Sequence, residues 1–135
     1  MSFKPNMKLL VVDDMSTMRK IIKNMLSQLG FKNIIEADDG RKALEIIDSA
    51  HKIGDPIEFI LSDWNMPDLN GLDFLKILKQ SEAHKNIPFL MITAEAEQGN
   101  VMIAVKSGVD NFIVKPFSAQ VLKEKIEKIF AKRGI

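Results

Sequence analysis

The chain alternates between short uninterrupted hydrophobic runs and longer segments in which hydrophobic residues recur every three or four positions. The first run, Lys8–Val12, is typical of a strand that is covered on both faces of a parallel sheet. In the next segment, 15–29, apolar side chains share one helical face, and Gly30 supplies a stop. This opening therefore predicts a strand followed by an amphipathic helix.

The same alternation continues to the end of the chain and predicts five strand–helix units. The predicted strands are 8–12, 33–37, 58–62, 87–92 and 111–114, and the predicted helices are 15–29, 41–50, 72–80, 99–107 and 118–132. Strict alternation implies a parallel sheet with right-handed crossovers and helices on both faces. We therefore predict a single α/β domain over residues 1–135, with a core of about 7–132.

Composition narrows the function classes. The net charge of +1, from 19 basic and 18 acidic residues, gives no overall field that would favour nucleic acid or an anionic membrane. The absence of cysteine excludes disulfides, thiolate metal sites and a thiol nucleophile. Residues 1–6 lack the apolar core of a signal peptide, and no apolar run approaches the ~20 residues that span a bilayer. We expect a cytoplasmic monomer that binds neither nucleic acid nor membrane.

Chemically active side chains follow four of the five predicted strands. Asp13 and Asp14 follow the first strand, Asp63 the third, Thr93 the fourth and Lys115 the fifth. Ligands of open α/β sheets bind beyond these carboxyl ends. Three carboxylates there would repel one another, by about 4 kcal/mol for each pair about 4 Å apart at an effective dielectric of about 20. A hard divalent cation would relieve this repulsion, and oxygen ligands without His or Cys suit Mg²⁺ better than zinc.

The same residue types suit phosphoryl transfer, which needs an in-line nucleophile, a cation and donors for developing charge. The Asp63 carboxylate is a competent nucleophile, Lys115 offers a compact positive charge, and Thr93 offers a hydroxyl. Each residue also has a simpler role when taken alone. Asp13 and Asp14 can cap the following helix, Thr93 can be a turn hydroxyl, and Lys115 can be a solvated lysine. Their joint placement at one edge favours the site.

Five segments of the chain carry a family resemblance, in order and at compatible spacing. They are Val11–Asp14, Ser16–Arg19, Asp63–Pro67, Thr93–Ala96 and Val114–Phe117. Together they resemble the receiver domain of bacterial two-component response regulators, in particular its chemotaxis branch, over nearly the whole chain. The resemblance implies a flavodoxin-like (βα)5 fold with a doubly wound, five-stranded parallel sheet of order 2-1-3-4-5.

The resemblance also implies roles for the acidic residues. It makes Asp63 the phosphoacceptor and places Mg²⁺ between Asp14, Asp63 and the backbone carbonyl of Asn65, with Asp13 acting through water. Asn65 and Glu95 flank the site at positions where this family tunes dephosphorylation. Phosphorylation would be catalysed by the chain itself, so the resemblance implies a switch rather than an enzyme.

The resemblance also implies a switch mechanism and a surface that binds the output partner. Thr93 and Lys115 are the switch residues: phosphorylation draws the threonine inward, and the aromatic side chain of Phe112 changes rotamer. The face built by the fourth helix, fifth strand and fifth helix is remodelled as a result. Its switch and partner residues would be Phe112, Ala96, Val101, Val114 and Lys125.

The implied partners are a chemotaxis histidine kinase as phosphodonor and a flagellar motor switch protein as target, and the resemblance admits a phosphatase as well. Two positions depart from the family pattern. Phe112 stands where close relatives usually have tyrosine, and Glu97-Gln98 stands where basic residues are common. The alternative is therefore a receiver-only phosphate sink, or a regulator of a non-flagellar partner.

Three rival classes fit the sequence less well. A Mg²⁺ phosphohydrolase with an aspartyl-phosphate intermediate would need a second acid two residues after the nucleophile, where Asn65 cannot exchange a proton. A flavodoxin-type cofactor carrier would need a phosphate loop where Asp13 and Asp14 would repel the phosphate. A DNA-binding transcription factor would need an output domain, whereas the chain ends at Ile135, just after the last predicted helix. We expect output by docking.

Overall fold

The computed structural model describes residues 4–94 and 98–135, and within α4 the side chains from residue 102 onward. Five strands and five helices alternate along the chain, as the sequence predicts. The strands are β1 (Lys8–Val12), β2 (Asn33–Ala37), β3 (Phe59–Asp63), β4 (Phe89–Thr93) and β5 (Asn111–Val114). The helices are α1 (Ser16–Gln28), α2 (Gly40–Lys52), α3 (Gly71–Lys79), α4 (Gln98–Lys106) and α5 (Ala119–Arg133).

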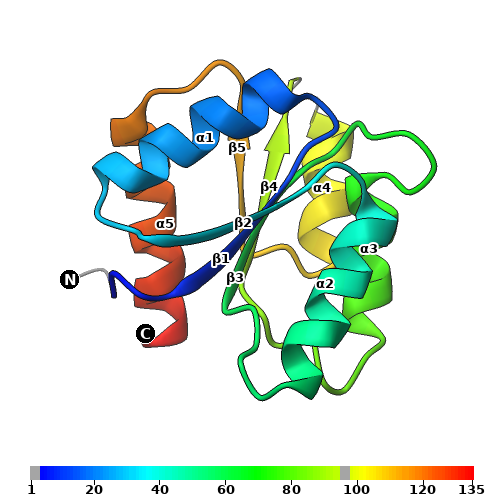
Figure 1. Cartoon of the computed structure of the whole chain (residues 1–135). Coiled ribbons are helices and arrows are strands. Elements are labelled where there is room, and N and C mark those ends of the chain that lie inside the picture. The colour runs from blue at the N-terminus through cyan, green and yellow to red at the C-terminus, as the bar shows by residue number, and fades with distance from the viewer. Residues whose placement is uncertain (1–3, 95–97) are drawn as a thin grey trace.

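All five strands are parallel and lie in the order β2-β1-β3-β4-β5, which confirms the predicted sheet. Helices α1 and α5 cover one face, and α2, α3 and α4 cover the other (Figure 1). The chain order reverses at β1, so the ends of β1 and β3 lie side by side at the point where such sheets bind ligands.

The hydrophobic runs of the central strands are buried because helices pack on both faces. Every residue of β1, β3 and β4 is buried. Alternate residues enter two separate cores: Leu10 and Ile60 pack with α2 and α3, whereas Leu9 and Leu61 pack with α1 and α5. This two-sided burial explains why these strands show continuous rather than alternating hydrophobicity.

Local polar side chains set several helix ends. Asp39, Asn70 and Ser118 are the N-cap residues of α2, α3 and α5, and each accepts a hydrogen bond from the backbone N–H three residues later. Strand β4 begins at Phe89, two residues later than predicted, because the Ile87 N–H donates to the carbonyl of His84 in a turn. The other predicted boundaries lie within two residues of those observed.

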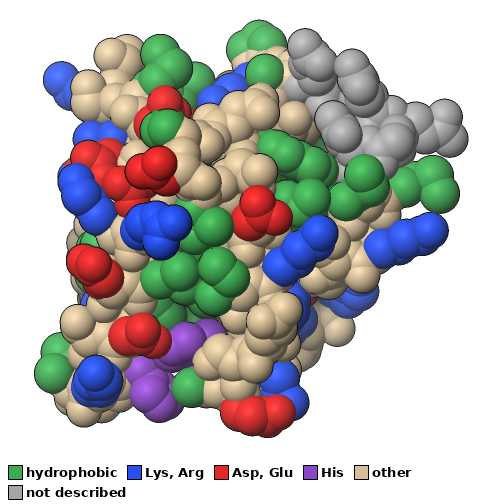
Figure 2. Space-filling model, turned by 90° about the vertical axis from the view of Figure 1, so that its right-hand side faces the viewer, with side chains coloured by type: hydrophobic (Ala, Val, Ile, Leu, Met, Phe, Trp, Pro, Cys, Tyr) green, Lys and Arg blue, Asp and Glu red, His purple; other side chains and the backbone are tan. Residues whose placement is uncertain are grey.

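Several apolar residues of helix α4 face away from the core. Ala104 is buried, but Met102, Ile103 and Val105 are exposed, as is Ile77 on α3. Hydrophobic side chains accordingly reach the surface on the side of the molecule that carries α2, α3 and α4 (Figure 2). Exposed apolar groups of this kind mark a surface that other molecules can cover.

Candidate metal and phosphoryl site

Backbone hydrogen bonds tie the strand ends together beyond the sheet itself. The Asp13 N–H donates to the carbonyl of Ala37 at 3.2 Å, and the Lys115 N–H donates to the carbonyl of Thr93 at 2.8 Å. The Trp64 N–H donates to the carbonyl of Ile92 at 2.9 Å. The residues that follow β1, β3, β4 and β5 are therefore held at one edge of the sheet.

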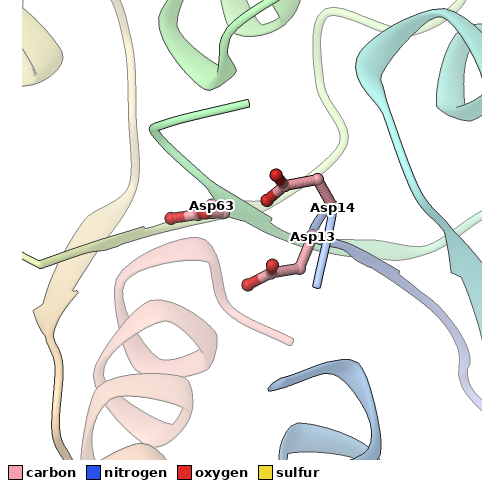
Figure 3. Close-up of side chains that lie close together, drawn as sticks. All are labelled: Asp13, Asp14 and Asp63. Carbon is pink, nitrogen blue, oxygen red and sulfur yellow. The ribbon is translucent and has the colours of Figure 1, made fainter. Parts of the chain in front are cut away.

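Three carboxylates meet at this edge, as the sequence predicts. One oxygen from each of Asp13, Asp14 and Asp63 lies within 4.8 Å of the others. Asp13 and Asp14 extend from the end of β1 and Asp63 from β3, and all three carboxylates point to the same side of the strand ends (Figure 3). Asp13 and Asp63 are buried, and Asp14 is exposed.

Lys115 lies between the two buried carboxylates. Its Nζ is 3.3 Å from Asp13 Oδ2 and 3.3 Å from Asp63 Oδ1. The side chain is 16% exposed, so this ammonium group is drawn into the site and is not a solvated surface charge. The Lys115–Pro116 peptide bond is cis.

The Asp63 carboxyl has a raised pKa, chiefly because burial disfavours its charged form. The negative charge of Asp13 raises the pKa further, while the attraction of Lys115 lowers it. A positive group of higher charge at the same edge would act in the same direction as Lys115 and favour the ionised carboxylate.

The donor set fits Mg²⁺ on chemical grounds. All three groups offer oxygen, and at least two of them are deprived of water, so their mutual repulsion favours a hard divalent cation. Asn65, whose carbonyl the resemblance adds to the ligands, is exposed two residues beyond Asp63. No His or Cys ligand belongs to this group of described residues, so zinc has no preferred ligand here.

Asp13 and Asp14 are not the cap of helix α1, which was the simpler alternative role for them. Asp13 Oδ1 accepts a hydrogen bond from the Met15 N–H at 2.9 Å, but α1 begins with Met15 as its N-cap residue. Among the described contacts, α1 has no side-chain cap. The carboxylates lie with Asp63 instead of closing the helix end.

The predicted switch residues occupy neighbouring strands. Thr93 is buried at the end of β4 and lies opposite Val114 on β5. Phe112 on β5 is half-buried, and Lys125 Nζ from α5 lies 5.2 Å from the centre of its ring. This distance is that of a cation–π contact, so Phe112 and Lys125 form one unit on the β5–α5 surface.

Some residues for which the sequence predicts a role in the site or in partner binding are not among the described residues. Glu95, Ala96 and Glu97 are outside the described residues, so the dephosphorylation role of Glu95 and the partner role of Ala96 stay predictions. The backbone of Val101 belongs to α4, while its side chain is not described.

Sequence reasoning gave no separate role to Arg19, which contacts the site from α1. Its Nη1 donates to the backbone oxygen of Asp13 at 2.7 Å, and its Nε donates to Glu36 Oε1 at 3.1 Å. The only sequence signal is its spacing: Arg19 lies one helical turn after Met15, on the side of α1 that faces the strand end. Such a contact between segments cannot be inferred from local pattern.

The two histidines lie together but far from this site. Their rings meet edge to face with centres 5.4 Å apart, and the buried His84 contacts Asp48 at 2.7 Å. The histidines, in purple, lie at the lower end of the molecule in Figure 2, whereas β4 ends at the upper end in Figure 1. His51 is exposed.

Comparison with known proteins agrees with this geometry. The model of the response regulator receiver domain family matches residues 9–127. The chain belongs to this family. Chemotaxis protein CheY of Pseudomonas aeruginosa is 51% identical over 126 residues, which cover 93% of this chain and 98% of that protein. Chemotaxis protein CheY1 of Helicobacter pylori is 50% identical over 123 residues, covering 91% and 96%.

Solved structures confirm the receiver fold. Chemotaxis response regulator CheY4 of Vibrio cholerae superposes with a TM-score of 0.81 at 29% identity, covering 92% of this chain and 98% of that one. A response regulator receiver domain protein from Clostridium thermocellum gives 0.79 at 28% identity, covering 94% and 96%. The chain is thus a CheY-type receiver. Within the described residues, no helix of this receiver combines the length and apolarity needed to cross a membrane.

Proposed function

We propose that this protein is a single-domain cytoplasmic response regulator of chemotaxis signalling, switched by phosphorylation of Asp63. A chemotaxis histidine kinase is its phosphodonor, and Mg²⁺ is its cofactor. The phosphorylated form uses the surface of α4, β5 and α5 to bind the flagellar motor switch. It acts as a monomer and as a phosphoacceptor, and it does not turn over external substrates.

One observation carries the proposal. Asp63 lies at the meeting point of two further carboxylates and one ammonium group, with Lys115 Nζ at 3.3 Å from both Asp13 and Asp63. This cluster combines a nucleophile, ligands for a hard cation and a fixed positive charge, which are the parts that phosphoryl transfer requires. The high identity to CheY proteins supports the chemotaxis assignment.

The residues divide the chemistry between them. An oxygen of Asp63 attacks the phosphorus of the donor, and the bond from phosphorus to the leaving group breaks with its electron pair on that group. A Mg²⁺ ion held at the Asp13, Asp14 and Asp63 carboxylates would supply positive charge to the phosphoryl oxygens. Lys115 places its ammonium beside Asp63 and donates to a second phosphoryl oxygen, and the buried Thr93 donates its hydroxyl to a third.

The output follows from the contact between Thr93 and its neighbouring strand. Thr93 pairs with Val114, which lies two residues after Phe112. A shift of Thr93 toward the phosphoryl group therefore disturbs the β4–β5 edge, where the Phe112 ring is held under Lys125. A change of the Phe112 rotamer alters both the shape and the charge position of that surface.

Acetyl phosphate tests the input half directly, because it needs no kinase. We expect intact-mass spectrometry to show one added phosphoryl group after incubation with acetyl phosphate and Mg²⁺. The modification should be lost in acid or hydroxylamine, as for an acyl phosphate. Excess EDTA should prevent it, because the carboxylates then repel the donor. Equal labelling with and without EDTA would contradict the metal role of Asp13 and Asp14.

A single hydroxyl tests the output half. Phe112→Tyr adds a group that can hydrogen-bond and so anchor one rotamer, and we expect motor-switch peptide binding by the phosphorylated protein to tighten roughly threefold to tenfold. Fluorescence anisotropy of a labelled peptide measures this, and equal acetyl-phosphate labelling of both proteins is the control. Tight phosphorylation-dependent binding by the protein that keeps Phe112 would argue against the alternative role as a phosphate sink.

A further inference from the structure

Arg19 connects helix α1 to the backbone of the acidic site. Its guanidinium bridges two acceptors: the backbone oxygen of Asp13, just after β1, at 2.7 Å and the carboxylate of Glu36 on β2 at 3.1 Å. The side chain is only 17% exposed. A largely buried, two-point contact of this kind holds its acceptors in a defined geometry.

The bond to Asp13 acts on the peptide that joins two of the three carboxylates. The oxygen that Arg19 holds belongs to the peptide group between Asp13 and Asp14, which is planar. Fixing that oxygen therefore fixes the direction in which the Asp14 Cα leaves Asp13. The Asp13 N–H is already held by Ala37, so the Arg19 bond completes the restraint on this strand end.

Asp14 depends on this restraint more than Asp13 does. The Asp13 carboxylate is buried and is held by the Met15 N–H and by Lys115. The Asp14 carboxylate is exposed, and no hydrogen bond or ion pair among the described residues holds it. Its approach to Asp63 is therefore set by its backbone.

From these contacts we infer that Arg19 is a positioning residue for the cation site: it holds the Asp13–Asp14 peptide so that Asp14 faces Asp63. The inference rests on the proposed function of this cluster as a Mg²⁺ site. It adds a residue of α1 that touches neither the cation nor the phosphoryl group but determines how well the ligands are arranged.

The charge of Arg19 and its positioning role predict opposite changes in Mg²⁺ affinity when the residue is replaced, so an experiment can distinguish them. A positive guanidinium near the cluster repels a divalent cation, so charge alone would make its removal tighten Mg²⁺ binding. Positioning predicts weaker binding, because a freed peptide must be ordered again by the cation. Arg19→Lys keeps the charge but cannot present the same two-point fork to Asp13 and Glu36.

The test is a Mg²⁺ titration of the metal-free full chain by isothermal calorimetry. We expect Arg19→Lys and Arg19→Gln each to raise the Mg²⁺ Kd at least about fivefold, since neither side chain can keep the charged two-point contact with the Asp13 oxygen and Glu36. The matched control is Lys23→Gln. Lys23 also pairs with Glu36, at 3.1 Å, but has no described contact with the carboxylates, so its Kd should stay within about twofold.

A double-mutant cycle tests whether Arg19 affects Mg²⁺ binding through Asp14. If Arg19 acts through Asp14, the effect of Arg19→Lys on Kd should shrink to less than about half in an Asp14→Asn background, because the ligand that it positions is gone. A merely structural role would leave the two effects independent. Circular dichroism in EDTA confirms that each variant is folded, and Glu36→Gln supplies a milder variant in which Arg19 itself is intact.

The outcomes distinguish this inference from the proposed function. No Mg²⁺ binding by the unmodified chain would overturn the metal site and the inference together. Binding by the unmodified chain with unchanged or tighter binding by both Arg19 variants would overturn the inference alone. The inference would also be overturned if Arg19→Lys raised the Mg²⁺ Kd by the same factor with and without the Asp14 carboxylate. Arg19 would then not act through Asp14.

Discussion

Replacing Asp63 with asparagine should abolish phosphorylation by acetyl phosphate, with a fall in labelling rate of at least about a thousandfold. The amide has nearly the same shape but lacks the anionic oxygen that the proposed attack on phosphorus needs, and it removes one carboxylate of the proposed cation site. Phosphorylation would be followed by intact-mass spectrometry. The matched control is Asp68→Asn in the same loop, where asparagine tolerates the left-handed backbone of φ 64°. Retained labelling of Asp63→Asn would contradict the phosphoacceptor assignment.

The same substitution should stabilise the metal-free fold at neutral pH, measured by urea unfolding in EDTA. Burial, and secondarily Asp13, raises the pKa of Asp63, so the native state binds a proton more tightly than the unfolded chain does. Ionised Asp63 therefore costs stability above its folded pKa, and the cost disappears as the pH falls below the unfolded value. The gain from Asp63→Asn should shrink accordingly in acid. A gain that persists there would argue against a charge origin.

Stability and the proposed chemistry place opposite demands on these carboxylates. Burial disfavours the charged form of Asp63, whereas the proposed phosphoryl transfer needs it ionised and needs the cation ligands beside it. Lys115 offsets part of the repulsion by lying 3.3 Å from both Asp13 and Asp63. Binding of Mg²⁺ to the native state alone would add further stability by mass action.

The fold could be predicted from sequence because its strongest signals are local. Strands β1, β2 and β5 have the predicted bounds, since apolar runs that end in turn or charged residues are unambiguous. The predicted start of strand β4 is two residues early, because Ile87 and Pro88 extend the apolar run but belong to a turn and a connection. Hydrophobicity does not distinguish a buried turn from a strand.

The site could be predicted in part for a related reason. Parallel strands bring their carboxyl ends to one edge, so the meeting of Asp13, Asp14 and Asp63 follows from topology once the strands are placed. The contacts of Arg19 and the stacking of Lys125 on Phe112 depend on side-chain direction across separate elements. The spacing of residues along one segment does not reveal side-chain direction, so the sequence does not predict these contacts.

Gly71 at the start of α3 provides a sensitive test of how the fold supports Asp63. A Cβ at this position would overlap the backbone oxygen of Asp63 and lie 2.9 Å from the Trp64 Cα. Backbone atoms cannot move aside as a side chain can, so the helix or the end of β3 must shift. We expect Gly71→Ala to lower the free energy of unfolding by about 3 kcal/mol, measured with urea.

The same clash should damage the site beyond the loss of stability. The Gly71 N–H donates to the Trp64 carbonyl at 2.8 Å, so α3 and the residue after Asp63 are coupled directly. In conditions where Gly71→Ala is fully folded, its Mg²⁺ affinity should fall about tenfold, because the Asp63 carboxylate is displaced. Asn70→Ala is the control: it removes the α3 cap, should cost about 1 kcal/mol, and should leave Mg²⁺ affinity unchanged. Equal metal binding by folded Gly71→Ala would mean that the site does not depend on this close approach.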